Sequence, residues 1–324
     1  MGTALHAVLH HDAGPAVEAL LARHRAPWLD LSWTPVRDRA GLPGALASAD
    51  VLLHVLDPID DAVMALAPRL RLIQKLGVGV NTIDLDAARR RDIAVANMPG
   101  VNTVAAAEHA LTLLLAVLRR LPDYHDATRA GRGWLVDPVL GEGCGEVAGR
   151  TVGLVGYGAI ASRFERALLA LDAHVLHTSR ATDGTAAWRT LDELLAASDV
   201  VSLHVPLTVE TDKLLSADRI ARLKPGAILV NTARGGLVDQ PALVEALRAG
   251  HIAGAGLDVF ADEPTTTADA ALLALDRVVV TPHVAWLTGE TLARCLDVAL
   301  ENCRRLHAGE ELLHRVVWGS PAAS

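Results

Sequence analysis

Three ionisable side chains in the C-terminal half of the chain, Arg234, Glu263 and His283, each follow a short apolar segment typical of a buried strand. A 2-keto acid that accepts a hydride needs its carboxylate neutralised, its carbonyl polarised and a proton delivered to the forming alkoxide. Arginine is a permanent cation that can do the first two, and histidine can deliver the proton. A glutamate on the far ring nitrogen would fix the tautomer of His283 and favour its imidazolium form. Each residue alone could be structural, but their combination at strand ends predicts acid–base chemistry coupled to hydride transfer.

A glycine-rich turn lies earlier in the chain, between an apolar strand and an amphipathic helix, with the pattern G-x-G-x-x-A from Gly156 to Ala161. In a dinucleotide-binding turn, Gly156 allows the tight bend, Gly158 lets the backbone approach a pyrophosphate, and Ala161 lets the helix pack on the strand. Ala159 and Ile160 begin that helix, whose N-terminus would face the phosphates. The alternative is a glycine turn that binds no ligand. The apolar strand before the turn and the amphipathic helix after it favour dinucleotide binding.

The expected strand at residues 174–177 should be followed by an acidic residue if the site holds the ribose of NAD. No Asp or Glu occupies the strand end, and Ser179 and Arg180 come next. A serine hydroxyl and an arginine guanidinium can bind the 2′-phosphate of NADP, which a carboxylate would repel. The pair therefore predicts a preference for NADP, with NAD as the second choice. The alternative is that Arg180 is a solvated loop charge.

The composition favours an enzyme that acts on a small molecule. The chain has 324 residues, 51% of them hydrophobic, which suggests about two domains. A net charge of −8 without a basic run argues against nucleic acid and anionic membranes as partners. The longest apolar helical stretch, 110–118, is too short to span a bilayer, and the N-terminus has no targeting pattern, so a cytoplasmic location is expected. Three cysteines without paired spacing predict no disulfide framework, and no metal is expected.

Short apolar segments alternate with Ala/Leu/Arg-rich helical stretches, which predicts repeated β-α-β units and an α/β fold with parallel sheets. The expected strands are 51–56, 93–96, 151–155, 174–177, 200–203, 227–230 and 277–280. The expected helices are 103–120, 160–171, 191–197, 241–249, 269–275 and 289–307. One sheet is expected within residues 1–98 and a second within 151–283. The carboxyl ends of parallel strands share one edge, where such sheets bind ligands, so the second sheet would bring the three ionisable residues together.

Over nearly its whole length the chain resembles the D-isomer-specific 2-hydroxyacid dehydrogenase family. The matching segments are 77–84 (GVGVNTID), 97–102 (NMPGVN), 107–109 (AEH), 202–208 (SLHVPLT), 231–235 (NTARG), 257–260 (LDVF), 263–264 (EP) and 282–283 (PH). The chain departs from the family at Ala161, where glycine is commoner, and a methyl group should be tolerated there.

The resemblance implies two doubly wound parallel-sheet domains. A Rossmann cofactor domain at 101–287 would be inserted in a flavodoxin-like substrate domain at 1–100 and 288–324. Hinge motion of the two domains would close the active site and exclude water. A homodimer is expected through the cofactor domain, with the helix at 103–120 and the arm that follows it.

The resemblance also assigns roles at the site. The backbone N–H groups of Val78 and Gly79 are expected to bind the substrate carboxylate. Asp258 matches the aspartate that binds the cofactor's carboxamide, although it could instead cap the following turn. Bulky indoles at Trp286 and Trp134 could narrow the substrate pocket or be ordinary packing. The expected cofactor contacts are Gly156, Gly158, Ala159, Ile160, Ser179, Arg180, Pro206, Thr211, Thr232, Arg234, Asp258 and His283.

The combined expectation is an NAD(P)-dependent oxidoreductase that reduces a small 2-keto acid to a D-2-hydroxy acid. Glyoxylate and hydroxypyruvate reductases of the family often carry a tryptophan after the catalytic histidine, as Trp286 follows His283 here. A phosphite dehydrogenase is disfavoured by Val78, where a lysine would be expected, and a formate dehydrogenase by Glu263, where a glutamine would be expected. A cofactor-binding, corepressor-like scaffold without catalysis is the remaining alternative. Residues around 54–56, expected to grip the distal group of the substrate, carry no motif, so the substrate stays open.

Overall fold

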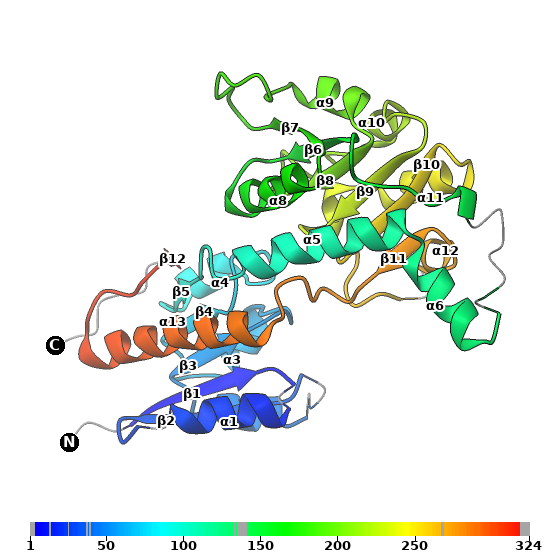
Figure 1. The fold of residues 1–324 in the computed structure, drawn as a ribbon. Helices are drawn as coiled ribbons and strands as arrows, with labels where there is room; N and C mark the ends of the chain where they lie inside the picture. Colours follow the sequence, from blue (N-terminus) through cyan, green and yellow to red (C-terminus); the bar gives the residue numbers. More distant parts are fainter. Residues whose placement is uncertain are drawn as a thin grey trace. The chain divides into compact units, whose positions relative to one another are not determined.

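The computed structural model describes residues 4–12, 14–24, 26–36, 38, 40–132, 134, 141–266 and 269–317. The chain divides into two compact units, unit 1 with residues 1–102 and 288–324 and unit 2 with residues 103–287. Each unit has its own six-stranded sheet (Figure 1). Within the described ranges, no helix is both long enough and apolar enough to cross a membrane.

Unit 1 has a sheet with the strand order β12-β5-β4-β3-β1-β2. Its strands are β1 (Leu5–His10), β2 (Leu29–Thr34), β3 (Val51–His54), β4 (Leu72–Lys75), β5 (Ala94–Ala96) and β12 (Arg315–Val317). Its helices are α1 (Pro15–Arg23), α2 (Leu42–Leu46), α3 (Asp61–Ala65), α4 (Leu85–Arg90) and α13 (Gly289–Ala308). β1 to β5 are parallel in the order 2-1-3-4-5 of flavodoxin-like folds, as expected. β12 is an unexpected addition, a short strand that pairs antiparallel with β5.

Unit 2 has an all-parallel sheet with the order β11-β10-β9-β8-β6-β7. Its strands are β6 (Thr151–Val155), β7 (His174–Thr178), β8 (Val200–Leu203), β9 (Ala227–Asn231), β10 (Ile252–Leu257) and β11 (Val278–Val280). Its helices are α5 (Thr103–Leu118), α6 (Leu121–Arg129), α8 (Ala159–Ala170), α9 (Leu191–Ala197), α10 (Ala217–Ala221), the 3-10 helix η1 (Gly235–Leu237), α11 (Gln240–Arg248) and α12 (Ala270–Leu273).

A parallel bridge between His177 and Trp188 extends the unit 2 sheet beyond β7. Dinucleotide-binding sheets have the strand order 3-2-1-4-5-6. Here the bridge at Trp188 takes the place of strand 3, and β7, β6, β8, β9 and β10 follow it in that order. β11 is one further strand at the other end of the sheet. The bridge is too short to have been recognised as a strand in the sequence. Both units are thus doubly wound α/β folds, which confirms the predicted fold class.

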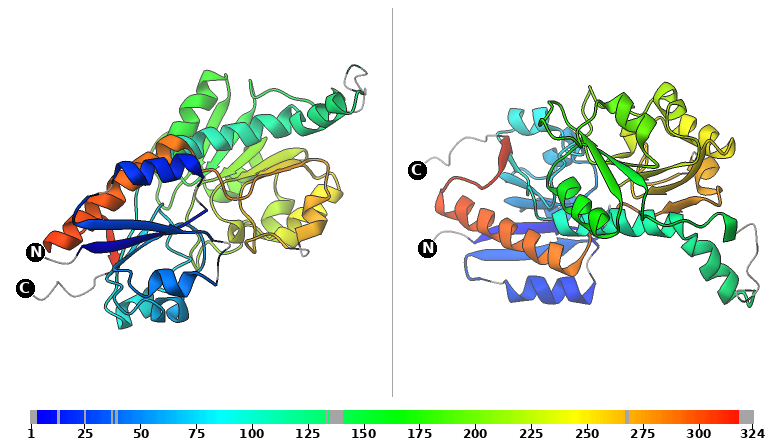
Figure 2. Two further views of the ribbon diagram at one scale, coloured as in Figure 1. Left: turned by 90° about the horizontal axis from the view of Figure 1, so that it is seen from below. Right: turned by 45° about the horizontal axis from the view of Figure 1, so that its top comes forward.

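Consecutive residues of the unit 2 strands enter two different cores, one on each face of the sheet. Leu154 of β6 packs with α5 and α8, whereas the next residue, Val155, packs with α9, α10 and α11. In β9, Val230 packs in the core with α5 and α8, and Leu229 packs in the core with α9, α10 and α11. α5 lies beside α8 over the first face (Figure 2). Burial on both faces explains why these strands are continuously apolar rather than alternating.

Candidate active site and cofactor site

The three predicted catalytic residues follow neighbouring strands at the carboxyl edge of the unit 2 sheet. Arg234 comes three residues after β9, Glu263 follows β10, and His283 comes three residues after β11. β9, β10 and β11 are adjacent and parallel, so the loops after them lie side by side. The sheet therefore brings these residues to the edge where open α/β sheets bind ligands.

Glu263 and His283 form a close pair. The Nδ1 atom of His283 lies 2.6 Å from Oε2 of Glu263, and the other carboxylate oxygen accepts a hydrogen bond of 3.1 Å from the backbone N–H of Phe260. The carboxylate is thus held by its own loop while it binds the imidazole. Because Nδ1 is engaged, Nε2 is the ring nitrogen that can exchange a proton with a reactant. The side chain of His283 is 17% exposed, so the ring remains accessible.

The backbone of His283 has a φ of 54°, in the left-handed region that non-glycine residues rarely adopt. Its N–H donates a hydrogen bond of 2.8 Å to the carbonyl of Asp258. The next two N–H groups, of Val284 and Ala285, donate to the Asp258 carboxylate at 2.9 and 2.8 Å. These bonds hold a conformation that costs backbone energy, and they set the direction of the imidazole.

The carboxylate of Asp258 is fully buried and is the centre of this arrangement. Besides the two backbone N–H groups, it accepts a hydrogen bond of 2.6 Å from Thr281 Oγ1, which lies 2.9 Å from Nε2 of His109. Burial raises the pKa of Asp258, but the hydrogen bonds from His109, Thr281 and the backbone outweigh it and leave the pKa below its ordinary value. These contacts are with the distant segment after β11, not with the turn directly after Asp258 that the sequence left as an alternative, and the contact of Asp258 with a carboxamide stays a prediction.

Thr281 and His109 were not singled out in the sequence, although both belong to or adjoin motifs of the family. His109 lies on α5 and Thr281 directly after β11, and they meet because α5 packs across β10 and β11. Nothing in the local sequence of either residue indicates the contact.

Arg234 is held by the loop that carries it. The side chain of Asn231 accepts a hydrogen bond of 3.0 Å from the N–H of Ala233 and donates one of 2.9 Å to the carbonyl of Arg234. The next residue must be glycine, because a Cβ at Gly235 would lie 1.9 Å from the backbone of Phe260. Burial lowers the pKa of Arg234 while the nearby Glu263 raises it, and arginine stays charged throughout the working range. A half-buried, permanently charged guanidinium suits the anchoring of a carboxylate.

The turn after β6 has the features of a pyrophosphate cradle. Gly156 has a φ of 94°, and a Cβ there would lie 2.8 Å from the carbonyl of His204 and 2.6 Å from a methyl of Val205. Gly158 is the N-cap of α8 without a side-chain cap, and no heavy atom of the described residues lies within 4 Å of where its Cβ would be. The start of α8 thus has open space at Gly158 and no side-chain cap for its first N–H groups, and the fully buried Ala161 lets the helix lie close to β6. These residues fit a dinucleotide, with Ala159 and Ile160 in the first turn.

The loop after β7 carries both a cation and a carboxylate. Arg180 is exposed, and Ser179 donates a hydrogen bond of 2.6 Å to the carbonyl of Ala181. The carboxylate of Asp183 lies 2.6 Å from Nε2 of His177 and accepts bonds from Thr185, which with His177 lower the pKa of Asp183 to about 2. This ionised group lies in the loop beyond the strand end, so the residues of the strand end alone do not indicate it.

The other predicted site residues are distributed over both units. In unit 2, Thr211 Oγ1 donates a hydrogen bond of 2.7 Å to the carbonyl of Pro206, Thr232 is half-buried, and Trp286 is 8% exposed. Trp134 is 96% exposed, so it fills no pocket within unit 2.

In unit 1, Val78 is exposed and Gly79 half-buried, and the carbonyl of Val78 accepts a hydrogen bond of 2.9 Å from Asn97. His54 is fully buried and lies 3.0 Å from the hydroxyl of Thr82, which leaves it no exposed surface for a substrate within that unit. Among the residues that the structure describes, no group of three or more His, Cys, Asp or Glu side chains could hold a metal ion.

Comparisons with known proteins show the family of the chain. A family model described as "D-isomer specific 2-hydroxyacid dehydrogenase, NAD binding domain" matches residues 111–285. The chain is 40% identical over 289 residues to a D-3-phosphoglycerate dehydrogenase of Mycobacterium leprae, and the match covers 87% of this chain and 54% of that protein. It is 41% identical over 270 residues to a glyoxylate reductase of Korarchaeum cryptofilum, covering 81% of this chain and 80% of that protein.

A solved structure with the same fold is the NADPH-dependent glyoxylate/hydroxypyruvate reductase of Sinorhizobium meliloti in complex with NADP and malonate. It is 30% identical with a TM-score of 0.81, and the match covers 99% of this chain and 100% of that chain. The chain spans about half the length of the phosphoglycerate dehydrogenase that it matches. The family model covers more than half of the chain and includes the dinucleotide turn and all three ionisable residues. The chain therefore belongs to the D-isomer-specific 2-hydroxyacid dehydrogenase family.

Proposed function

We propose that the protein is an NAD(P)-dependent D-2-hydroxyacid dehydrogenase that works as a reductase of a small 2-keto acid, glyoxylate or hydroxypyruvate. The observation that carries the proposal is the 2.6 Å pair of Glu263 and His283 on the sheet edge that also carries Arg234 and the glycine turn at Gly156. Such a constellation supplies a proton donor, a cation for an anionic substrate and a cradle for a dinucleotide.

Each residue of the trio has a separate task in the proposed reaction. The nicotinamide cofactor, when bound, supplies or accepts the hydride. His283 delivers a proton from Nε2 to the carbonyl oxygen of the keto acid, or removes it from the hydroxyl in the reverse direction. Glu263 holds the ring through Nδ1 and stabilises its protonated form. Arg234 neutralises the substrate carboxylate and polarises the carbonyl, a task to which the backbone N–H groups of Val78 and Gly79 would contribute.

Glu263 also separates this proposal from formate chemistry. In formate oxidation, the formate ion loses a hydride and becomes carbon dioxide. No proton leaves the substrate, so the enzyme needs no proton acceptor. A carboxylate that favours imidazolium at His283 serves a reaction in which a proton accompanies the hydride.

We propose a preference for NADPH, supported by the exposed guanidinium of Arg180 and the hydroxyl of Ser179 after β7. Asp183, in the same loop, accepts hydrogen bonds from Thr185 and contacts His177, and its charge would oppose a 2′-phosphate. Arg180→Ala should lower kcat/KM for NADPH by about tenfold and leave the value for NADH nearly unchanged, because one charge-assisted bond to phosphate is lost. A wild-type preference for NADH would contradict this part of the proposal.

Two further expectations of the sequence belong to the proposal, a cytoplasmic location and a homodimer formed through unit 2. For the homodimer, Leu115 on α5 and Leu121 at the start of α6 are exposed, at 37% and 60%. Part of the arm expected to contribute, residue 133 and residues 135–140, lies outside the described residues. Light scattering of the purified protein would measure the oligomeric state, and fractionation of cells would locate it.

The deciding experiment is a spectrophotometric panel of glyoxylate, hydroxypyruvate, pyruvate and branched 2-keto acids with NADPH and with NADH. D-3-phosphoglycerate with NAD and NADP is included in the oxidative direction, because one similar protein is named for that substrate. The proposal expects the highest kcat/KM with glyoxylate or hydroxypyruvate. Tight cofactor binding without turnover of any 2-keto or 2-hydroxy acid would instead support a corepressor-like scaffold.

A further inference from the structure

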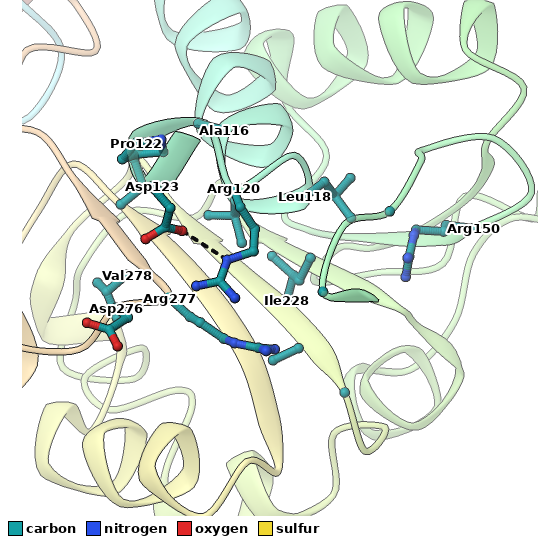
Figure 3. A pocket seen from close by; sticks show the side chains of 16 residues that line it. Ala116, Leu118, Arg120, Pro122, Asp123, Arg150, Ile228, Asp276, Arg277 and Val278 are labelled. Atoms are coloured by element: carbon teal, nitrogen blue, oxygen red, sulfur yellow. Dashed lines mark hydrogen bonds and ion pairs between the residues drawn. The ribbon is translucent and has the colours of Figure 1, made fainter. Parts of the chain in front are cut away.

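A second concentration of positive charge lies at the opposite edge of the unit 2 sheet from the trio. Arg150 directly precedes β6 and Arg277 directly precedes β11, so both lie at the amino edge of a parallel sheet. Arg120 comes from the junction of α5 and α6. The three side chains line one cavity of about 90 Å³ (Figure 3). The cavity is within unit 2 and shares no residue with the carboxyl edge described above.

Two of these guanidinium groups converge on the same point. A Cβ placed on Gly143 would lie 3.3 Å from Nη1 of Arg120 and 3.4 Å from Nη2 of Arg277. A Cβ on Gly145 would lie 2.5 Å from Nη2 of Arg150. Glycine at both positions therefore leaves room for the three head groups. Like charges repel, so the approach of Arg120 and Arg277 to one another needs an anion or carboxylates to offset it.

The carboxylates of the cavity offset only part of this charge. Arg120, whose side chain is 12% exposed, donates to Asp123 at 2.9 Å. The carboxylate of Asp276 points away from the guanidinium of Arg277 (Figure 3). Arg150 donates its Nε–H to the carbonyl of Glu146 at 2.6 Å. In the described part of the chain, neither Arg150 nor Arg277 forms a direct ion pair with a carboxylate, but Arg150 lies near enough to Asp199 to contribute to the lowered pKa of that carboxyl.

The backbone adds to the same site. Arg120 has a φ of 50°, a left-handed conformation that turns the chain from α5 into α6. Pro122 and Asp123, in the first turn of the nine-residue α6, line the cavity, so the positive end of the α6 dipole lies beside the arginines. A left-handed non-glycine residue costs energy, and it is found where the surrounding structure requires it.

We propose that this cavity is a binding site for a phosphate group, either inorganic phosphate or the phosphoryl group of a small phosphomonoester. The planar fork of arginine matches phosphate oxygens, and Arg150 and Arg277 have N–H donors free of carboxylate partners. A water molecule needs roughly 10–15 Å³ of such space, so a cavity of about 90 Å³ has room for a tetrahedral anion. The ligand would join the start of β6 and β11 to the α5–α6 junction. Occupancy should therefore stabilise unit 2 against unfolding.

The test is thermal unfolding of the full chain with saturating NADPH, so that the dinucleotide turn is already filled. Inorganic phosphate is titrated at constant ionic strength against sodium chloride, and glycerol 1-phosphate is titrated in a parallel series. An occupied site should raise the unfolding midpoint of the wild type by about 2–4 °C. A larger rise with glycerol 1-phosphate assigns the site to a phosphorylated metabolite, and an equal or smaller rise assigns it to free phosphate.

Variants decide whether the effect belongs to this cavity. Arg277→Gln and Arg150→Gln should each weaken the affinity for phosphate by about tenfold, measured by calorimetry, since each removes a charge-assisted bond. Arg248→Gln is the control, because Arg248 lies on the exposed face of α11 in an ion pair with Glu245 and its loss should leave the affinity unchanged.

Two results would overturn the proposal. One is a wild-type midpoint that phosphate does not raise above the chloride control, or that it raises equally in Arg277→Gln. The other is a change of oligomeric state in Arg277→Gln, seen by light scattering, together with no phosphate effect in the wild type. That outcome would assign the arginines to a contact between copies of the chain.

Discussion

The two edges of the unit 2 sheet both carry arginine, but they differ in how its charge is compensated. At the carboxyl edge, Arg234 lies near Glu263, which itself binds His283 at 2.6 Å. At the amino edge, three arginines line one cavity and only Arg120 donates to a carboxylate among the described residues. The carboxyl edge therefore holds an internally balanced set of acid, base and cation, whereas the amino edge holds an excess of cation.

The difference shows what each edge is suited to do. Proton transfer near neutral pH needs an acid–base side chain and a partner that sets its tautomer, and His283 with Glu263 provides both. Arginines do not titrate in that range, so the amino edge can bind and stabilise but cannot exchange protons. Variants at the carboxyl edge should change turnover, and variants at the amino edge should change anion binding and stability.

His283→Ala should give the largest effect. Loss of the proton donor should reduce kcat by about 10²–10⁴-fold, because a positioned acid or base contributes that much. The affinity for NADPH, measured by fluorescence titration, should change by less than about threefold, since the glycine turn at Gly156 uses different groups. Unchanged turnover would remove His283 from the mechanism and with it the distinction between the two edges.

Arg234→Lys tests whether the cation of the carboxyl edge acts by shape as well as charge. An ammonium keeps the charge but not the planar fork, so kcat/KM for the keto acid should fall by about 10²-fold. Arg277→Lys at the amino edge is the matched control, and it should leave steady-state turnover unchanged. A fall in turnover with both variants would contradict the separation of roles.

Thr281→Val removes the hydroxyl that donates to Asp258 at 2.6 Å and contacts His109 at 2.9 Å. Thr281 is a positioning residue, because it acts through the segment that carries His283. We expect kcat to fall by about tenfold with KM changed by less than about twofold. Thr281→Ser should restore kcat, since it returns the hydroxyl without the methyl. Equal losses in both variants would indicate a packing effect instead.

Much of the carboxyl edge could be predicted from the sequence. Strands buried on both faces are continuously apolar, so the ends of β9, β10 and β11 and the residues after them could be read directly. The glycine pattern at 156–161 placed the start of α8 to within one residue. The family to which the chain belongs was also recognised from these segments.

The parts that the sequence did not predict depend on contacts between distant segments. His109 and Thr281 are 172 positions apart and meet only because α5 packs on β11. Asp183 pairs with His177 across a loop, so a search of the strand end could not find it. The arginines of the amino edge come from three separate segments without a motif. β12 has only three residues, too few for its pattern to be distinguished.

His204→Gln gives the smallest expected effect. It tests whether the pH dependence of stability comes from a histidine at the carboxyl edge. His204 follows β8, with Nε2 2.9 Å from the hydroxyl of Ser202, and burial lowers its pKa to about 4 from an ordinary 6.5. Between those two values the unfolded chain binds a proton that the folded chain does not, so stability falls as pH falls from 6.5 toward 4.

Glutamine does not titrate and can keep the bond to Ser202. The unfolding midpoint of the wild type should therefore drop between pH 7 and pH 5 by about 2–4 °C more than that of His204→Gln. The amino edge offers the contrasting case, because Arg277→Gln removes a group with no titration in this range and should leave the pH dependence as it is in the wild type. If His204→Gln and the wild type lost stability in parallel, the acid sensitivity would have to arise elsewhere in the chain.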